Sequence, residues 1–156
     1  MGRVELAVMT RAQCHALYQG WENDPALYLD TAEYRPYVYD EAAVDRYFDA
    51  RQTPDQVLFA VLLDGRPIGE VQLKAINRDK RECTLSIHLQ NDAVKGHGYG
   101  TQAEKLAVRY ASEQLDLQAV NADAVITNIR SQHVLEKAGF RLVREDVGFR
   151  YYRVER

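Results

Sequence analysis

Three alternate glycines mark the stretch Gln90-Asn-Asp-Ala-Val-Lys-Gly-His-Gly-Tyr-Gly-Thr101. The run before it, Glu82–Leu89, alternates apolar and polar side chains with the period of a half-buried strand. The run after it repeats apolar residues at helical spacing from Ala103 to Ala111. The sequence therefore predicts a strand, a glycine-rich loop and a helix that begins at the end of the loop.

A loop of this kind is suited to bind an anion. Glycine tolerates positive φ and lets a ligand approach the backbone closely. The first turn of a helix presents unpaired N–H groups at the positive end of its dipole, so a phosphate fits there. A Walker loop needs Gly-Lys-Ser/Thr and the dinucleotide fingerprint needs Gly-x-Gly-x-x-Gly, and this stretch has neither. The alternative is a flexible loop followed by an ordinary helix.

Residues 94–101 resemble the acetyl-CoA loop of the GNAT N-acetyltransferases, whose pattern is Gln/Arg-x-x-Gly-x-Gly/Ala at the start of a helix. Lys95, Gly98 and Gly100 stand at its fixed positions, with lysine in place of the usual glutamine or arginine. A second stretch, Asn128–Phe140, resembles the family's Asn-x-x-Ser/Ala motif and the helix that ends in Glu-Lys-x-Gly-Phe. The resemblance covers nearly the whole chain and is nearest to the ribosomal-protein N-terminal acetyltransferase branch.

The resemblance implies acetyl-CoA as co-substrate, held mainly by backbone N–H groups. It also implies that strands 82–89 and 119–126 run parallel but splay apart at their ends, which admits the pantetheine arm of the cofactor. The residues that it assigns to cofactor binding are Leu89, Val94, Lys95, Gly96, His97, Gly98, Tyr99, Gly100, Thr101, Asn128 and Ser131.

Composition predicts one soluble globular domain, residues 1–156, since 46% of the side chains are apolar and 28% are charged. A net charge of −3 with interspersed signs argues against nucleic acid as a partner. No run is apolar enough for a membrane span or a signal peptide, so we expect a cytoplasmic protein. Cys14 and Cys83 have no partner at metal-ligand spacing, so we expect reduced cysteines and no metal site.

Hydrophobic periodicity and turn residues predict the element order β-α-α-β-β-β-α-β-α-β-β. This order indicates an α/β (α+β) fold, and the resemblance implies a three-layer GNAT-like one: a central mixed, mostly antiparallel sheet of about seven strands with helices on both faces. The predicted strands are 4–9, 57–63, 68–76, 82–89, 119–126, 140–144 and 147–154, and the predicted helices are 11–22, 40–51, about 101–115 and 128–138.

Acetyl transfer from a thioester to an amine needs a neutral amine, a group that stabilises the oxyanion and a proton for the thiolate. In this family the amine attacks directly, and a backbone N–H near His88 and Leu89 would polarise the thioester. Many members place a tyrosine acid where this chain has Leu135. We therefore expect Ser131 to be the acid, with a role in capping or packing its helix as the alternative.

Three residues are candidates for the general base, because the glutamate that related enzymes place near Thr84 is missing. Glu70, Glu82 and His88 lie on the polar faces of neighbouring predicted strands and would act through a water. His88 is favoured because the ordinary pKa of histidine lies near neutrality, although a single strand histidine is more often structural.

The expected function is acetyl transfer to the primary amine of a small molecule or of a peptide N-terminus. Tyrosines in the 27–39 loop would bind the amine by cation–π contact or would serve as core and lid. The alternative functions are a degenerate acyl-CoA-binding or sensing module without catalysis and, last, a purely structural domain. A homodimer is a possible assembly.

Overall fold

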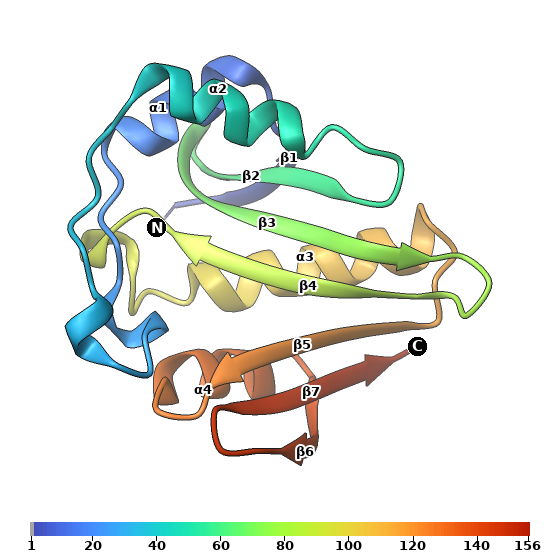
Figure 1. Cartoon of the computed structure of the whole chain (residues 1–156). Coiled ribbons are helices and arrows are strands. Elements are labelled where there is room, and N and C mark those ends of the chain that lie inside the picture. Colours follow the sequence, from blue (N-terminus) through green and yellow to red (C-terminus); the bar gives the residue numbers. More distant parts are fainter. Residues whose placement is uncertain (1) are drawn as a thin grey trace.

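A computed structural model describes residues 2–156 as one sheet with helices on both faces (Figure 1). The strand order is β1-β2-β3-β4-β5-β7-β6, and β4 and β5 form the single parallel pair in this part of the chain. The strands are β1 (Val4–Val8), β2 (Val57–Leu63), β3 (Arg66–Asn77), β4 (Glu82–Leu89), β5 (Ala119–Val125), β6 (Arg141–Glu145) and β7 (Phe149–Glu155). The predicted fold class and element order are confirmed.

Helices α1 and α2 cover one face of the sheet, and α3 and α4 cover the other. Their bounds are α1 (Arg11–Gln19), α2 (Glu41–Ala50), α3 (Tyr99–Glu113) and α4 (Ile129–Lys137). Three short 3₁₀ helices, η1 (Pro25–Leu27), η2 (Thr31–Glu33) and η3 (Asp92–Val94), were not predicted. Each begins after an Asp or Asn side chain that accepts a backbone N–H bond, a local signal that hydrophobic periodicity does not detect.

Two predicted helix ends are confirmed, whereas α1, predicted to reach Glu22, ends at Gln19 with Gly20 as its C-cap. Asp40 accepts hydrogen bonds from the N–H groups of Ala42 and Ala43, so it is the N-cap of α2. Gly139 takes φ +101° just after α4, and the next residue, Phe140, folds back into the core with 2% of its surface exposed.

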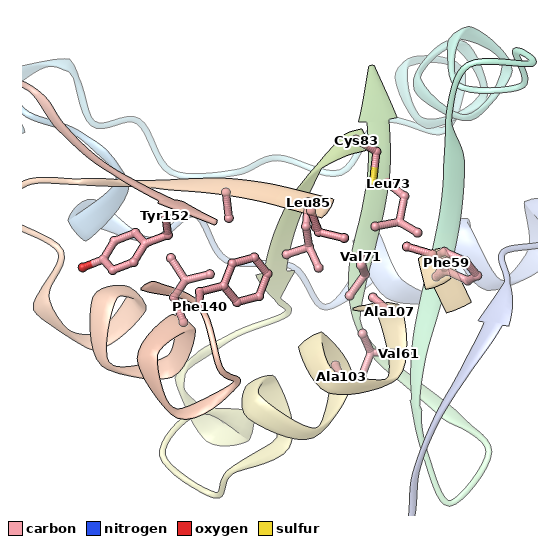
Figure 2. Packing of buried hydrophobic residues seen from close by; sticks show 14 of the residues in the cluster. Phe59, Val61, Val71, Leu73, Cys83, Leu85, Ala103, Ala107, Phe140 and Tyr152 are labelled. Carbon is pink, nitrogen blue, oxygen red and sulfur yellow. The ribbon is translucent and has the colours of Figure 1, made fainter. Parts of the chain in front are cut away.

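The alternating sides of β3 build two different layers. Val71 and Leu73 face α3 and join the larger core, where they pack with Ala103 and Ala107 of that helix (Figure 2). Glu70 faces the opposite way, toward α1 and α2, whose smaller core holds residues such as Cys14, Leu17 and Leu58. Glu70 and Gln72 of β3 and His88 of β4 therefore lie on the α1/α2 side of the sheet.

Strands β4 and β5 separate after a short paired segment. Their register contains only the pairs Glu82–Ala119, Cys83–Val120 and Thr84–Asn121, although both strands continue beyond it. The splay that the family resemblance implied is therefore present.

Close packing holds the free end of β4 against β3. A Cβ atom on Gly69 would lie 2.7 Å from the carbonyl oxygen of His88, which is too close for any other residue. The β2–β3 register shifts beside Gly69, between Val61 and Leu62. The glycine therefore marks both a bulge and a close approach, the two interpretations that a glycine inside a strand allows.

Two further sequence expectations concern sites. Cys14 and Cys83 are free and buried, and burial raises the pKa of each thiol to about 12, so both are unreactive core residues. Residues 2–156 contain no group of three potential metal ligands. None of the helices described is long and apolar enough to cross a bilayer.

Candidate active site

One cavity of about 610 Å³ opens where β4 and β5 separate. Residues from both sides of the sheet line it: Tyr18 and Tyr47 come from the α1/α2 side, and Gly100 and Glu104 come from the α3 side. His88 and Leu89, on opposite faces of β4, both line it as well. The cavity therefore extends through the sheet and connects its two faces.

The loop beside the α3 end of this cavity has an anion-binding geometry: Lys95 and Gly100 line the cavity, and the loop between them carries two more glycines that do not. Gly96 and Gly98 have φ +77° and +82°, and a Cβ on either would meet open space. Gly98 is the N-cap of α3, with no side-chain hydrogen bond closing this end of the helix. The first-turn N–H groups of a 15-residue helix are thus left for a ligand, and such a helix start favours an anion.

Lys95 serves a different purpose from a free cation beside the phosphates. Its Nζ lies 2.9 Å from Asp24 Oδ2 and 3.3 Å from Asp92 Oδ1, and its side chain is only 10% exposed. Burial acts to raise the pKa of Asp24, but hydrogen bonds from Lys95 and from the N–H of Ala26 outweigh it and lower that pKa. Lys95 therefore ties the glycine loop to the segment that begins with η1.

The other predicted cofactor residues of the loop differ in how deeply they are buried. Val94 is buried in the larger core and is not part of the cavity wall, so it anchors the loop. His97 is exposed and stacks on Tyr99 with ring centroids 5.3 Å apart. Thr101 is half-buried in the first turn of α3.

The start of α4 contributes the second motif to the cavity wall. Asn128 is buried and its Oδ1 accepts the N–H of Ser131 at 3.2 Å, so Asn128 is the residue that caps this helix. Both residues line the cavity. Leu135, one turn further along, is 2% exposed in the core and offers no proton.

Aromatic rings form the α1/α2 end of the cavity. Tyr18 lies at their centre, with its ring centroid 4.6 Å from that of Trp21, 5.7 Å from that of Tyr37 and 5.4 Å from that of Tyr47. Of the tyrosines in the 27–39 loop, Tyr28 and Tyr37 line the cavity. Tyr39 instead hydrogen-bonds to His15, at 2.7 Å.

A buried carboxylate lies behind these rings. Glu70 is 1% exposed and accepts hydrogen bonds from the hydroxyls of Tyr18 and Tyr47 and from Gln72 Nε2, the last at 2.8 Å. Burial first, and then the charge of Glu70, raise the pKa of both tyrosines. The two hydroxyls therefore stay protonated and donate their hydrogens to the carboxyl oxygens of Glu70.

His88 lies opposite Glu70 in the β3–β4 register and lines the cavity. Its ring meets the edge of Trp21 with centroids 6.5 Å apart. Burial lowers the pKa of His88, and the charge of Glu70 only partly offsets this. The imidazole is thus neutral at pH 7 and can accept a proton.

Glu82 requires a correction. It lies at the start of β4, about 20 Å along the strand from His88. Its Oε2 pairs with Arg153 Nη1 at 3.1 Å, and it is not among the residues that line the cavity. Sharing the polar face of a strand did not imply sharing a site, because the site occupies only the splayed end of β4.

Glu104 was not predicted as a site residue. It lies on α3, has no exposed surface and lines the cavity, and within residues 2–156 neither of its carboxyl oxygens has a hydrogen-bond partner. Burial raises its pKa to about 8. The signal was present, because Gly100, Ala103, Ala107 and Ala111 mark the buried face of the helix and Glu104 falls within it.

Comparisons with known proteins agree with this geometry. The chain is 38% identical over 77 residues to the probable N-acetyltransferase YjcK of Bacillus subtilis (strain 168), a match that covers 49% of this chain and 42% of that protein. The chain thus matches less than half the length of this relative.

Two solved structures share the fold at low sequence identity. One is spermidine N-acetyltransferase from Vibrio cholerae in complex with CoA and spermine, with a TM-score of 0.81, 16% identity and coverage of 97% of this chain and 95% of the other. The other is aminoglycoside acetyltransferase AAC(6')-Ib in complex with coenzyme A and kanamycin, with a TM-score of 0.76, 20% identity and coverage of 99% and 95%.

The family follows from a match to a family model over most of the chain. The model of the acetyltransferase (GNAT) domain family matches residues 3–141, which include the glycine loop, the splayed strands and the Asn128 motif. With the cavity that these elements build, the match shows that this chain belongs to the GNAT acetyltransferase family.

Proposed function

We propose that this protein is an acetyl-CoA-dependent N-acetyltransferase that acetylates the primary amine of a small cationic molecule by direct attack. One observation carries the proposal: a single cavity joins the anion-binding loop at the N-terminus of α3 to an aromatic wall with a neutral His88 beside it. Such a cavity lets two substrates meet from opposite faces of the sheet, as direct transfer requires.

The donor end holds acetyl-CoA through the backbone. The N–H groups of the first turn of α3 bind the pyrophosphate, and the free edge of β4 at His88 and Leu89 borders the arm. Acetyl-CoA supplies the activated acetyl group and a thiolate leaving group. Asn128 holds the start of α4 in place at the same wall.

The acceptor end suits an amine that carries positive charge. The rings of Trp21, Tyr18 and Tyr37 can bind a cation by cation–π contact, and the acidic side chain of Glu70 lies directly behind Tyr18. The amine must lose a proton before it attacks. His88, neutral and lining the same cavity, accepts that proton directly or through a water, and Glu70 stabilises the imidazolium that forms.

Ser131 is the proposed proton donor to the thiolate. It lines the cavity at the start of α4. The alternative role for Ser131 was to cap this helix, but Asn128 is the residue that caps it. We expect Ser131→Ala to lower kcat by about 10-fold to 10²-fold with little change in CoA affinity, because a general acid acts only as the bond breaks. Steady-state kinetics from about pH 6 to about pH 9 checks this. Turnover equal to wild type would leave protonation of the thiolate to solvent.

Donor binding is tested by Gly98→Asp. A carboxylate beside the pyrophosphate should weaken CoA binding by about 1 kcal/mol or more, which is roughly fivefold in Kd. Gly65→Asp is a matched control, because Gly65 also has positive φ (+85°) and open space around it, but lies in the β2–β3 hairpin. Titration calorimetry compares the two variants. Equal CoA affinity in both would contradict the loop assignment.

The acceptor class is tested with a panel of amines and a thiol-release assay. We expect turnover on polyamines or other small cationic amines, and little on neutral amines of the same size. Turnover confined to peptide N-termini would instead support the ribosomal-protein branch, which the comparisons do not confirm. Tight CoA binding without turnover on any amine would identify a degenerate acyl-CoA-binding module. The homodimer and the cytoplasmic location stay predictions.

A further inference from the structure

Glu104 is a buried acid in the donor half of the cavity, and its carboxyl group has no hydrogen-bond partner among residues 2–156. It lies one helical turn, about 6 Å, beyond Gly100 on the same side of α3. A Cβ on Gly100 would lie 3.5 Å from Val134 and 4.0 Å from Leu89, so this side of α3 faces the start of α4 and the splayed end of β4. Glu104 therefore borders the slot between the splayed strands.

No group in the described residues compensates a charge on Glu104. Neither carboxyl oxygen makes a hydrogen bond, and burial alone accounts for its raised pKa. None of the titratable and charged groups on the bordering elements is bonded to Glu104: Arg66, Glu70 and Lys74 on β3, Glu82, Cys83 and His88 on β4, Lys95 and His97 in the loop, Tyr99, Lys105, Arg109, Tyr110 and Glu113 on α3, Asp123 on β5, and Arg130, His133, Glu136 and Lys137 on α4. A carboxylate left unpaired in an apolar slot is costly, so the group is held as the neutral acid.

We propose that protonated Glu104 donates a hydrogen bond to an amide of the pantetheine arm and so positions the acyl donor, an inference that rests on the proposed function. An amide carbonyl is a neutral acceptor, which a neutral carboxylic acid can match in an apolar slot without unpaired charge. Glu104 lies one turn beyond the N–H groups that bind the phosphates, so the arm passes it and the phosphates do not.

The protonation state has a further consequence for the donor. Coenzyme A is an anion, and an ionised Glu104 in the slot would repel it and lose the hydrogen it donates. Donor binding should therefore be strong while Glu104 is protonated and should weaken as the pH rises above about 8, the pKa to which burial raises this group.

The test is calorimetric titration of the full chain with CoA from about pH 6 to about pH 9.5. Above the pKa of Glu104, the affinity of wild type for CoA should fall with pH, by no more than roughly 10-fold per pH unit. Glu104→Gln keeps a donor at the same place and cannot ionise, so its affinity should be much less dependent on pH. The thiol and phosphates of CoA titrate equally in both proteins, so the difference between the two curves reports Glu104.

A second ligand and a second variant locate the effect. Adenosine 3′,5′-bisphosphate lacks the arm, so its affinity should be the same in wild type, Glu104→Gln and Glu104→Leu. CoA should bind Glu104→Leu about fivefold more weakly than wild type at pH 7, because a hydrogen bond is lost. The infrared band of a protonated carboxyl, present in wild type at pH 7 and lost near pH 9, should be missing from Glu104→Gln.

Different failures have different meanings. If wild type binds no CoA at any pH, the proposed function is overturned. If CoA binds but its affinity follows the same pH curve in wild type and Glu104→Gln, the positioning role is overturned while the proposed function stands. A large loss of kcat in Glu104→Gln with unchanged CoA affinity would also overturn the positioning role, because this result would identify Glu104 as a proton donor in the reaction.

Discussion

Replacing His88 with glutamine is expected to lower kcat/KM for the best amine by about 10²-fold or more at pH 7.5. Glutamine can still hydrogen-bond at the end of β4, but it cannot take a proton from the attacking amine. The affinity for CoA should not change, since the phosphates are bound at the N-terminus of α3. Steady-state kinetics with separate calorimetric titration of CoA distinguishes the two effects.

The pH profile adds a sharper test of the same residue. Burial lowers the pKa of His88, so the wild-type rate should fall with acid only below the ordinary histidine pKa of about 6.5. This acid limb should be missing from His88→Gln. His133→Gln is a suitable control, because His133 is exposed on α4 and outside the cavity wall. Unchanged kcat/KM in His88→Gln would contradict the assignment and would point to Glu70 acting through a water.

The second large effect concerns stability. We compare the free energy of unfolding of Glu104→Leu with that of wild type at two pH values. The difference, variant minus wild type, is expected to be on the order of 3 to 4 kcal/mol larger at pH 8 than at pH 5. The native state holds the proton of Glu104 up to about pH 8, whereas the unfolded chain releases it near the ordinary glutamate pKa of 4.5. Between these values the unfolded state binds fewer protons, so the stability of wild type falls as the pH rises.

Chemical denaturation at about pH 5 and pH 8 measures this difference. The leucine variant has no such proton, so its stability relative to wild type should grow across this window and level off above it. Gln102→Leu is a matched control on the exposed face of the same helix. A constant stability difference between wild type and Glu104→Leu at the two pH values would show that Glu104 titrates normally. A buried acid that costs stability is typical of a functional site.

The sequence by itself determined the family and most of the fold. Hydrophobic alternation located β4, helical spacing located α3, and the glycines between them located the loop that joins the two, because each of these signals is local in the chain. The same holds for Asp40 as a cap and for Gly139 as the end of α4. Such features need no information about distant residues.

The tertiary structure decided which side chains share the site, because this depends on register and on the splay of two strands. Glu82 and His88 have the same place in a pattern of alternation, yet only the end of β4 that carries His88 reaches the cavity. Lys95 matched a cofactor position by sequence, but its charge is taken by Asp24, 71 residues away. Only the folded structure shows that Glu104 is buried against the sheet without a hydrogen-bond partner, since burial and pairing depend on how α3 packs.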